Sequence, residues 1–135
     1  MNVLFVDDSH ERFYRISVAL MYTSAALDHA VIMDKALEFL ATYQYDYIFL
    51  DYDLGENAGS GRGVAEYIAR NIEKFIGCTI VIHSANPAGA QHMLNDIQNA
   101  MERYEQQHTV FNPIKLYYAP LLHADKCFLK TIGLL

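Results

Sequence analysis

The chain has 135 residues, of which 53% are hydrophobic and 19% charged, and this balance excludes intrinsic disorder. Its length predicts a single domain, residues 1–135. Asp and Glu outnumber Lys and Arg by 16 to 10, which argues against non-specific binding to a nucleic-acid backbone or an anionic membrane.

No apolar stretch is long enough to span a membrane, and Asp7 and Asp8 stand where a signal peptide would be apolar, so we expect a cytoplasmic protein. Cys78 and Cys127 lack the spacing of a metal site or a disulfide framework. Both cysteines are interpreted as buried apolar residues.

Strands and helices alternate along the predicted chain. In order, we expect a strand at Val3 to Val6, a helix around 13–20, a weaker strand at Ala26 to Ala30, a short helix at Asp34 to Leu40, a strand at Tyr47 to Leu50, a helix around 64–72, a strand at Thr79 to Ile82, a helix around 94–104, a strand at Ile114 to Tyr118 and a last helix from about Asp125. The main strand runs are continuously apolar, as in strands covered on both faces. This alternation predicts a five-stranded parallel sheet of doubly wound, flavodoxin-like α/β architecture.

Acidic residues follow two of the predicted strands. Asp7 and Asp8 come after the first strand, and Asp51 and Asp53 come after the strand that ends at Leu50. The carboxyl ends of parallel strands share one edge of the sheet, so these carboxylates should converge and repel one another unless a cation lies between them. Mg²⁺, or Mn²⁺ in its place, suits such oxygen ligands. The alternative is that these residues only cap helices and turns, and Asp53 could contribute its backbone carbonyl instead of its side chain.

Polar residues also follow the strand that ends at Ile82. His83 is a candidate proton donor, and Ser84 is a candidate hydroxyl for contacting phosphate. Asn86 and Pro87 fit the N-cap and first position of a helix, whose N-terminus would face the same edge.

A glycine-rich stretch surrounds Arg62. Gly59, Gly61 and Gly63 could wrap an anion with their backbone N–H groups, or they could form a mobile loop. The sequence leaves both possibilities open.

Three segments, Val3 to Asp8, Asp46 to Asp51 and Ile82 to Ala85, resemble the receiver (CheY-like) domains of two-component signalling. The resemblance implies that Asp7 and Asp8 hold magnesium, that Asp51 accepts a phosphoryl group and that Ser84 contacts it. It also implies that Asp53 offers its backbone carbonyl to the metal.

One position departs from the receiver pattern. Receivers carry a lysine just before a proline after the last strand, whereas this chain has Ala119 and Pro120 there. Lys115 lies at the opposite end of the predicted strand. This departure weakens the expectation of an ordinary phosphorelay.

Further matches resemble the cyclic-phosphate processing receiver domains of bacteria and their viruses. They are Asp7-Asp8 followed by Arg12, the run Asp51 to Gly55, and the longer element His83-Ser84-Ala85-Asn86-Pro87-Ala88-Gly89-Ala90. Tyr52 stands where many such sequences have histidine. The resemblance implies action on a cyclic phosphate in nucleotide or RNA-end metabolism. Arg12 and Asn86 from these motifs, and Arg62 from the glycine-rich stretch, are the candidate residues for binding the phosphorylated ligand.

Three functions remain open. The first is a metal-dependent phosphoesterase that opens a cyclic phosphate on a nucleotide-like substrate, with Asp51, His83 and Ser84 as catalytic residues and Asp51 either a metal ligand or the nucleophile. The second is a signalling receiver phosphorylated at Asp51. The third is a sensor that binds a phosphorylated nucleotide without turnover. A homo-oligomer is also possible, because the apolar residues 132–135 could either cover the sheet or contact a second copy.

Overall fold

The computed structural model describes residues 1–120 and 125–135. Its five strands form one parallel sheet in the order β2-β1-β3-β4-β5. The strands are β1 Asn2–Val6, β2 Ala26–Ala30, β3 Tyr47–Leu50, β4 Thr79–Ile82 and β5 Lys115–Tyr118. The doubly wound, flavodoxin-like sheet predicted from the sequence is therefore confirmed. The strand order reverses between β1 and β3, which is where such sheets bind their ligands.

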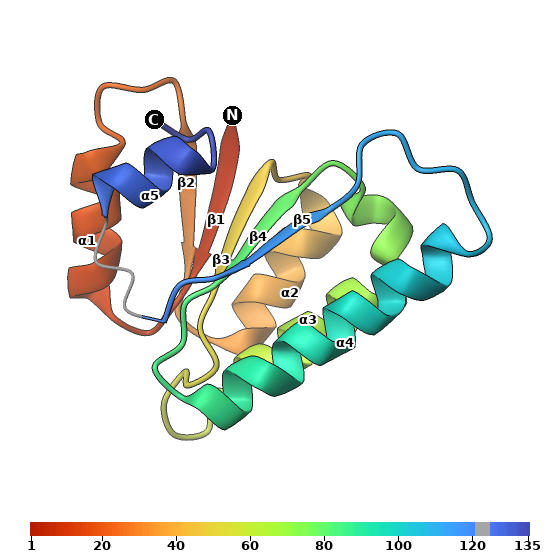
Figure 1. Ribbon diagram of the computed structural model, residues 1–135. Helices are drawn as coiled ribbons and strands as arrows, with labels where there is room; N and C mark the ends of the chain where they lie inside the picture. The colour runs from red at the N-terminus through yellow and green to blue at the C-terminus, as the bar shows by residue number, and fades with distance from the viewer. Residues whose placement is uncertain (121–124) are drawn as a thin grey trace.

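Helices cover both faces of the sheet (Figure 1). The helices are α1 His10–Ala19, α2 Met33–Thr42, α3 Gly61–Arg70, a 3₁₀ turn η1 at Ile72–Phe75, α4 Pro87–Glu105 and α5 Lys126–Thr131. Helices α1 and α5 lie on one face, whereas α2, α3 and α4 lie on the other. Each face has its own apolar core, because successive strand residues point to opposite sides.

The face under α1 and α5 is central to the site. Phe5, Phe49 and Val81 project from three adjacent strands into this core, where Ile16 of α1 and Leu129 of α5 pack against them. All five side chains are almost fully buried. This packing fixes α1 against the sheet.

Side chains cap the helices that begin near this edge. The Ser9 hydroxyl accepts a hydrogen bond from the backbone N–H of Arg12 at 3.1 Å and starts α1. The Asn86 side chain accepts from the N–H of Gly89 at 3.0 Å and starts α4, with Pro87 in the first turn as predicted.

Three sequence-based expectations need correction. Gly61 and Gly63 lie in the first turn of α3 and do not form a loop. Ile72 belongs to η1, because α3 ends before it. Cys78 is buried as expected, but Cys127 is exposed because it lies on the solvent side of the short helix α5.

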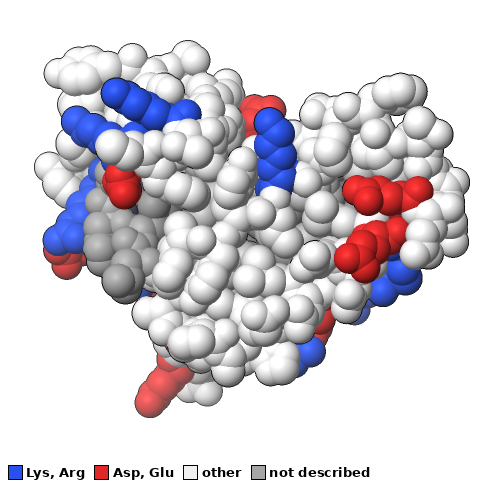
Figure 2. Space-filling model, in the orientation of Figure 1, with Lys and Arg blue, Asp and Glu red and all other residues white. Residues whose placement is uncertain are grey.

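The C-terminal apolar residues cover the sheet. Ile132 and Leu134 are buried in the core under α1 and α5, which is one of the two roles the sequence allowed for them. Figure 2 shows basic side chains on the α1 and α5 side of the molecule and acidic side chains near η1 and the end of α4. Among the described residues, no helix is long and apolar enough to cross a membrane.

Candidate functional site

One row of residues follows directly after the paired strand segments. The register pairs Val6 with Leu50, Leu50 with Ile82 and Ile82 with Tyr118. The next row therefore consists of Asp7, Asp51, His83 and Ala119. The backbone continues the ladder there, because the N–H of Asp51 donates to Val6 at 2.9 Å and the N–H of Ala119 donates to Ile82 at 2.8 Å. Since side chains alternate along a strand, this row begins on the face covered by α1 and α5.

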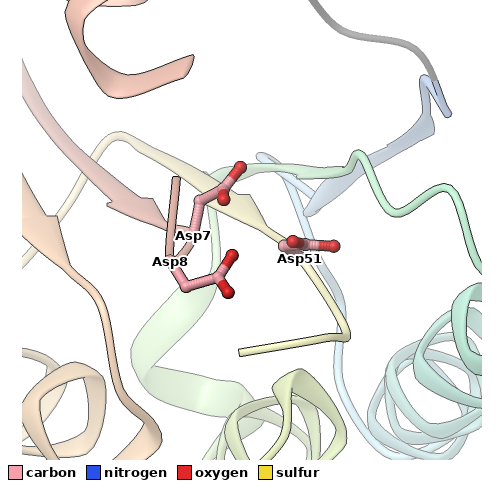
Figure 3. A group of neighbouring side chains, drawn as sticks. All are labelled: Asp7, Asp8 and Asp51. Atoms are coloured by element: carbon pink, nitrogen blue, oxygen red, sulfur yellow. The ribbon is translucent and has the colours of Figure 1, made fainter. Parts of the chain in front are cut away.

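Three carboxylates meet at this edge. Asp7, Asp8 and Asp51 each offer an oxygen, and these oxygens all lie within 4.8 Å of one another. Figure 3 shows the carboxylates of Asp7 and Asp8, from the end of β1, turned toward the side on which Asp51 lies at the end of β3. The Asp7 side chain is fully buried and that of Asp51 is 8% exposed, whereas the Asp8 side chain is 43% exposed. The carboxylates of Asp7, Asp8 and Asp51 therefore converge as the sequence predicted, and the cluster is exposed to solvent on the side of Asp8.

Arg12 lies among the three carboxylates. Its Nε and Nη2 donate to the two oxygens of Asp7 at 2.7 and 2.8 Å. Its Nη2 is also 3.5 Å from an oxygen of Asp51 and 3.8 Å from an oxygen of Asp8. Arg12 was predicted to bind the substrate. In this structure its guanidinium is the counterion of the acidic cluster.

The surroundings of Asp51 change the acidity of its carboxyl group. Burial and the nearby Asp7 carboxylate raise the pKa of Asp51 to about 6. Arg12, the Ser84 hydroxyl and the backbone N–H of Tyr52 act in the opposite direction and lower this pKa, but they do not cancel the effect.

The residues present fit a divalent cation. Three carboxylate oxygens at this spacing are hard donors of the kind that Mg²⁺ and Mn²⁺ take, and the exposed side of Asp8 leaves room for water ligands. Three carboxylates also carry more negative charge than the one guanidinium of Arg12 neutralises. Asp53 is not part of this cluster. Its side chain is exposed, and among the described residues the group of carboxylates close enough to share an ion consists of Asp7, Asp8 and Asp51.

His83 lies beneath the carboxylates and does not face solvent. Its ring stacks on Phe5 at a centroid distance of 5.0 Å, and its Nδ1 is 3.7 Å from an oxygen of Asp7. Its Nε2 is buried and has no hydrogen-bond partner among the described residues. Burial lowers the pKa of His83 to about 4, so the ring is neutral near pH 7. In this conformation His83 supports Asp7 from below and cannot touch a ligand at the edge, so its predicted role as a proton donor is not supported by this geometry.

Ser84 and Asn86 lie close together after β4. The Ser84 hydroxyl oxygen accepts from the backbone N–H of Asn86 at 3.1 Å. The same hydroxyl lies near Asp51 and lowers the pKa of that carboxyl. The Asn86 side-chain oxygen is occupied by the N–H of Gly89. Ser84 therefore lies near Asp51, whereas Asn86 caps the start of α4.

Arg62 lies away from the carboxylates. Its Nε is 3.3 Å from Asp96 on α4 and 3.5 Å from Glu66 on its own helix, so it links α3 to α4. This contradicts the expectation that Arg62 and the neighbouring glycines form a phosphate-binding loop. The glycines have another reason to be present, since side chains at Gly59 and Gly63 would collide with Met33 of α2.

Two glycines, Gly61 and Gly89, pack closely against the loop that follows Asp51, and neither contact was predicted from the sequence. The Cα of Gly61 packs on the backbone carbonyl of Asp51, and any side chain there would overlap that carbonyl. The N–H of Gly61 also donates to the carbonyl of Tyr52 at 2.8 Å. The ring of Tyr52 packs on Gly89, where a Cβ would overlap it. The available signal was the pair of glycines themselves, because glycine at a buried helix position often marks close approach of another backbone or ring.

The fold is that of response-regulator receiver domains. A two-component response regulator from Clostridium difficile matches with a TM-score of 0.68 and 18% identity, covering 99% of this chain and 94% of that one. The response regulator TrrA from Thermotoga maritima, solved in complex with Mg²⁺ and BeF, matches with a TM-score of 0.66 and 19% identity over 99% and 98% of the two chains.

A response regulator from Burkholderia pseudomallei, solved with a phosphorylated aspartic acid, a calcium ion and citrate, matches with a TM-score of 0.65 and 17% identity, covering 95% of this chain and 64% of that one. No protein with a curated function matches the chain significantly. The family model described as the cyclic-phosphate processing receiver domain matches residues 2–99, which include Asp7, Asp8, Asp51 and the segment from His83 to Ala90. The chain therefore belongs to the cyclic-phosphate processing receiver domain family.

Proposed function

We propose that the protein is a divalent-metal-dependent phosphoesterase that opens a cyclic phosphate on a nucleotide-like substrate. The observation that carries this proposal is the cluster of Asp7, Asp8 and Asp51, whose oxygens lie within 4.8 Å of one another around a net negative charge. Phosphate is an anion, so an acidic site attracts it only after a cation has reversed the local charge. The match to the cyclic-phosphate processing receiver domain supports this class of substrate.

The reaction needs few groups from the chain. Water adds to phosphorus, one of the two ring P–O ester bonds breaks, and the proton from water ends on the departing sugar oxygen. A bound Mg²⁺ or Mn²⁺ would neutralise charge that develops on the phosphoryl oxygens. Asp7 and Asp8, which follow β1, and Asp51, which follows β3, would be its side-chain ligands.

The proton for the departing oxygen comes from solvent in this proposal. Asp8 is the exposed member of the cluster, and water reaches the edge beside it. His83 has a supporting role, because its buried ring holds Asp7 in position rather than facing the substrate. The Ser84 hydroxyl favours the charged form of Asp51.

The test is product analysis by mass spectrometry with 2′,3′-cyclic, 3′,5′-cyclic and ADP-ribose cyclic phosphates, each with Mg²⁺, with Mn²⁺ and with EDTA. We expect one class to gain the mass of water, with loss of activity in EDTA and in Asp51→Asn. Asp34→Asn is the matched control, because Asp34 is an exposed carboxylate in the first turn of α2. Hydrolysis that persists in EDTA or in Asp51→Asn would overturn the proposal, as would the absence of any product.

A second candidate is a receiver that is phosphorylated on Asp51. Its support is the Ser84 hydroxyl, which lies near the Asp51 carboxylate and lowers its pKa, at the place where a phosphoryl group would be attached. The phosphorylated aspartic acid in the Burkholderia pseudomallei protein gives a precedent within the fold. The methyl group of Ala119 in the same row offers no positive charge to that phosphoryl group. Incubation with acetyl phosphate and Mg²⁺ should add one phosphoryl mass if this function holds, and Asp51→Asn should prevent the addition.

A further inference from the structure

Arg12 is bound to the acidic cluster more tightly on one side than on the other. The guanidinium makes two hydrogen bonds of 2.7 and 2.8 Å to Asp7 but lies 3.5 Å from Asp51 and 3.8 Å from Asp8. Its side chain is 36% exposed and extends from the first turn of α1, directly above the edge. The group therefore fills one side of the cluster and can leave toward solvent without disturbing the core.

Arg12 is also the positive charge of this site. Among the described residues, the one other basic group within 4 Å of a carboxylate oxygen of the cluster is the buried ring of His83, while Nε2 of His29 contacts the backbone carbonyl of Asp7 at 2.8 Å. The remaining member of the row, Ala119, carries no charge. Without Arg12, the carboxylates of Asp7 and Asp51 would face each other inside the protein with no counterion from the described residues.

We propose that Arg12 is an exchangeable counterion that stabilises the ion-free cluster, is displaced from Asp7 when a divalent cation binds, and then contacts the phosphoryl group of the ligand. This inference rests on the proposed function, since it assumes that the cluster binds a metal. It assigns to Arg12 two states, one on the carboxylates and one on the ligand.

The exchange follows from charge and space. A guanidinium and a divalent cation among carboxylates that lie within 4.8 Å of one another repel strongly. A divalent ion would contact three carboxylates, whereas the guanidinium makes two hydrogen bonds to one carboxylate, that of Asp7. Once displaced, Arg12 remains tethered by α1 at the edge, where its planar fork matches two oxygens of a phosphate. The same side chain would thus prevent repulsion in the empty site and recognise the ligand in the filled one.

Metal affinity gives the first test. Mn²⁺ binding is measured by electron paramagnetic resonance of the free ion and by calorimetry in wild type, Arg12→Gln and Arg12→Lys. We expect Arg12→Gln to bind Mn²⁺ about tenfold more tightly, because the competing charge is gone. Arg12→Lys keeps the charge without the two-point bond and should fall between the two. Arg15→Gln is the matched control, because Arg15 lies on the same helix but pairs with the exposed Glu11.

Phosphate affinity gives the second test, and here Arg12→Gln should weaken binding, whereas it should strengthen the binding of Mn²⁺. With saturating Mg²⁺, inorganic phosphate is titrated into the same proteins and followed by the shift in melting temperature. Arg12→Gln should weaken phosphate binding about tenfold or more, while Arg15→Gln should leave it unchanged. A purely structural Arg12 would change both affinities in the same direction or neither.

Stability measurements separate the exchange from simple unfolding. In EDTA, Arg12→Gln should melt below wild type, and the gap should narrow with Mn²⁺, because the ion replaces the lost counterion. If Arg12→Gln does not fold in EDTA, Arg12→Lys carries the comparison. If wild type binds Mn²⁺ but neither Arg12 variant binds it more tightly, the inference is overturned while the metal site stands. Failure of every variant and of wild type to bind Mn²⁺ would overturn the metal site and the inference together.

Discussion

Nδ1 of His83 lies 3.7 Å from an oxygen of Asp7, and both side chains are buried. The imidazole stacks on Phe5 and leaves its Nε2 without a hydrogen-bond partner among the described residues. A charged ring would be strongly disfavoured there, because burial outweighs the attraction of Asp7. His83 is therefore a neutral side chain packed beneath the acidic edge, and its titration can be tested directly.

The first prediction concerns the stability contribution of His83. The unfolded chain protonates this histidine near its ordinary pKa of 6.5, whereas the folded pKa is about 4. Between these values the unfolded state binds more protons, so this residue adds stability as the pH rises from 4 to 6.5. His83→Phe should stabilise the protein relative to wild type by about 1 to 2 kcal/mol more at pH 5 than at pH 7.5.

Urea unfolding at the two pH values measures this difference. The exposed His92 supplies the control variant His92→Phe, which changes a histidine outside the core. NMR titration gives an independent check, since the ring of His83 should remain neutral down to about pH 5. Protonation of this ring above pH 6 would contradict the burial argument.

The second prediction concerns Asp51 in the absence of metal. Its folded pKa of about 6 lies above the ordinary value of 3.8, so the folded state binds the extra proton in this window. The contribution of Asp51 to stability is therefore highest at low pH and is lost as the pH rises through 6. In EDTA at pH 7.5, Asp51→Asn should stabilise the protein by about 1 to 2 kcal/mol, and the gain should vanish near pH 4.

Saturating Mg²⁺ should reverse this order. Wild type then gains stability from the ion, whereas Asp51→Asn has lost one ligand and gains less. Thermal melts with Mg²⁺ and with EDTA measure both effects. An Asp51→Asn protein that is less stable than wild type in EDTA at pH 7.5 would show that the carboxylates are not in conflict.

The third prediction uses the exposed member of the cluster. Asp8→Asn removes one oxygen ligand from a side chain that is 43% exposed, so the fold should lose less than about 0.5 kcal/mol without metal. Its affinity for Mn²⁺ should fall about tenfold or more, because a charged ligand is lost. Calorimetry tests this, with Asp34→Asn as the control. Unchanged Mn²⁺ affinity in Asp8→Asn would remove Asp8 from the ligand set.

The fourth prediction concerns the glycines of α3. Gly61→Ala should destabilise the protein by about 2 kcal/mol and weaken Mn²⁺ binding, because the new Cβ would displace the backbone of Asp51. Gly63→Ala meets the flexible side chain of Met33 instead, so its cost should be smaller and Mn²⁺ affinity should be retained. Urea unfolding and calorimetry compare the two variants. Equal losses of metal affinity in both would contradict the close approach at Asp51.

Much of the fold could be predicted from the sequence because its signals are local. The strand from Tyr47 to Leu50 and the strand from Thr79 to Ile82 were predicted with the bounds that the structure has. Continuous apolar runs mark strands buried on both faces, and Asn86 and Pro87 mark the start of α4. The positions of Gly61 and Gly63 were harder to predict. Glycine is common in loops, but it also occurs in helices where a neighbouring segment comes too close for a side chain.

For the site, the sequence by itself determined the meeting of Asp7, Asp8 and Asp51. Residues that follow neighbouring parallel strands share one edge whatever the helices do, so strand assignment was sufficient. Only the tertiary structure decided that Arg12 reaches these carboxylates while Arg62 turns to α4, and that His83 points inward. Those outcomes depend on where a helix lies over the sheet and which face each strand residue takes. Both are set by packing between segments that are distant along the chain.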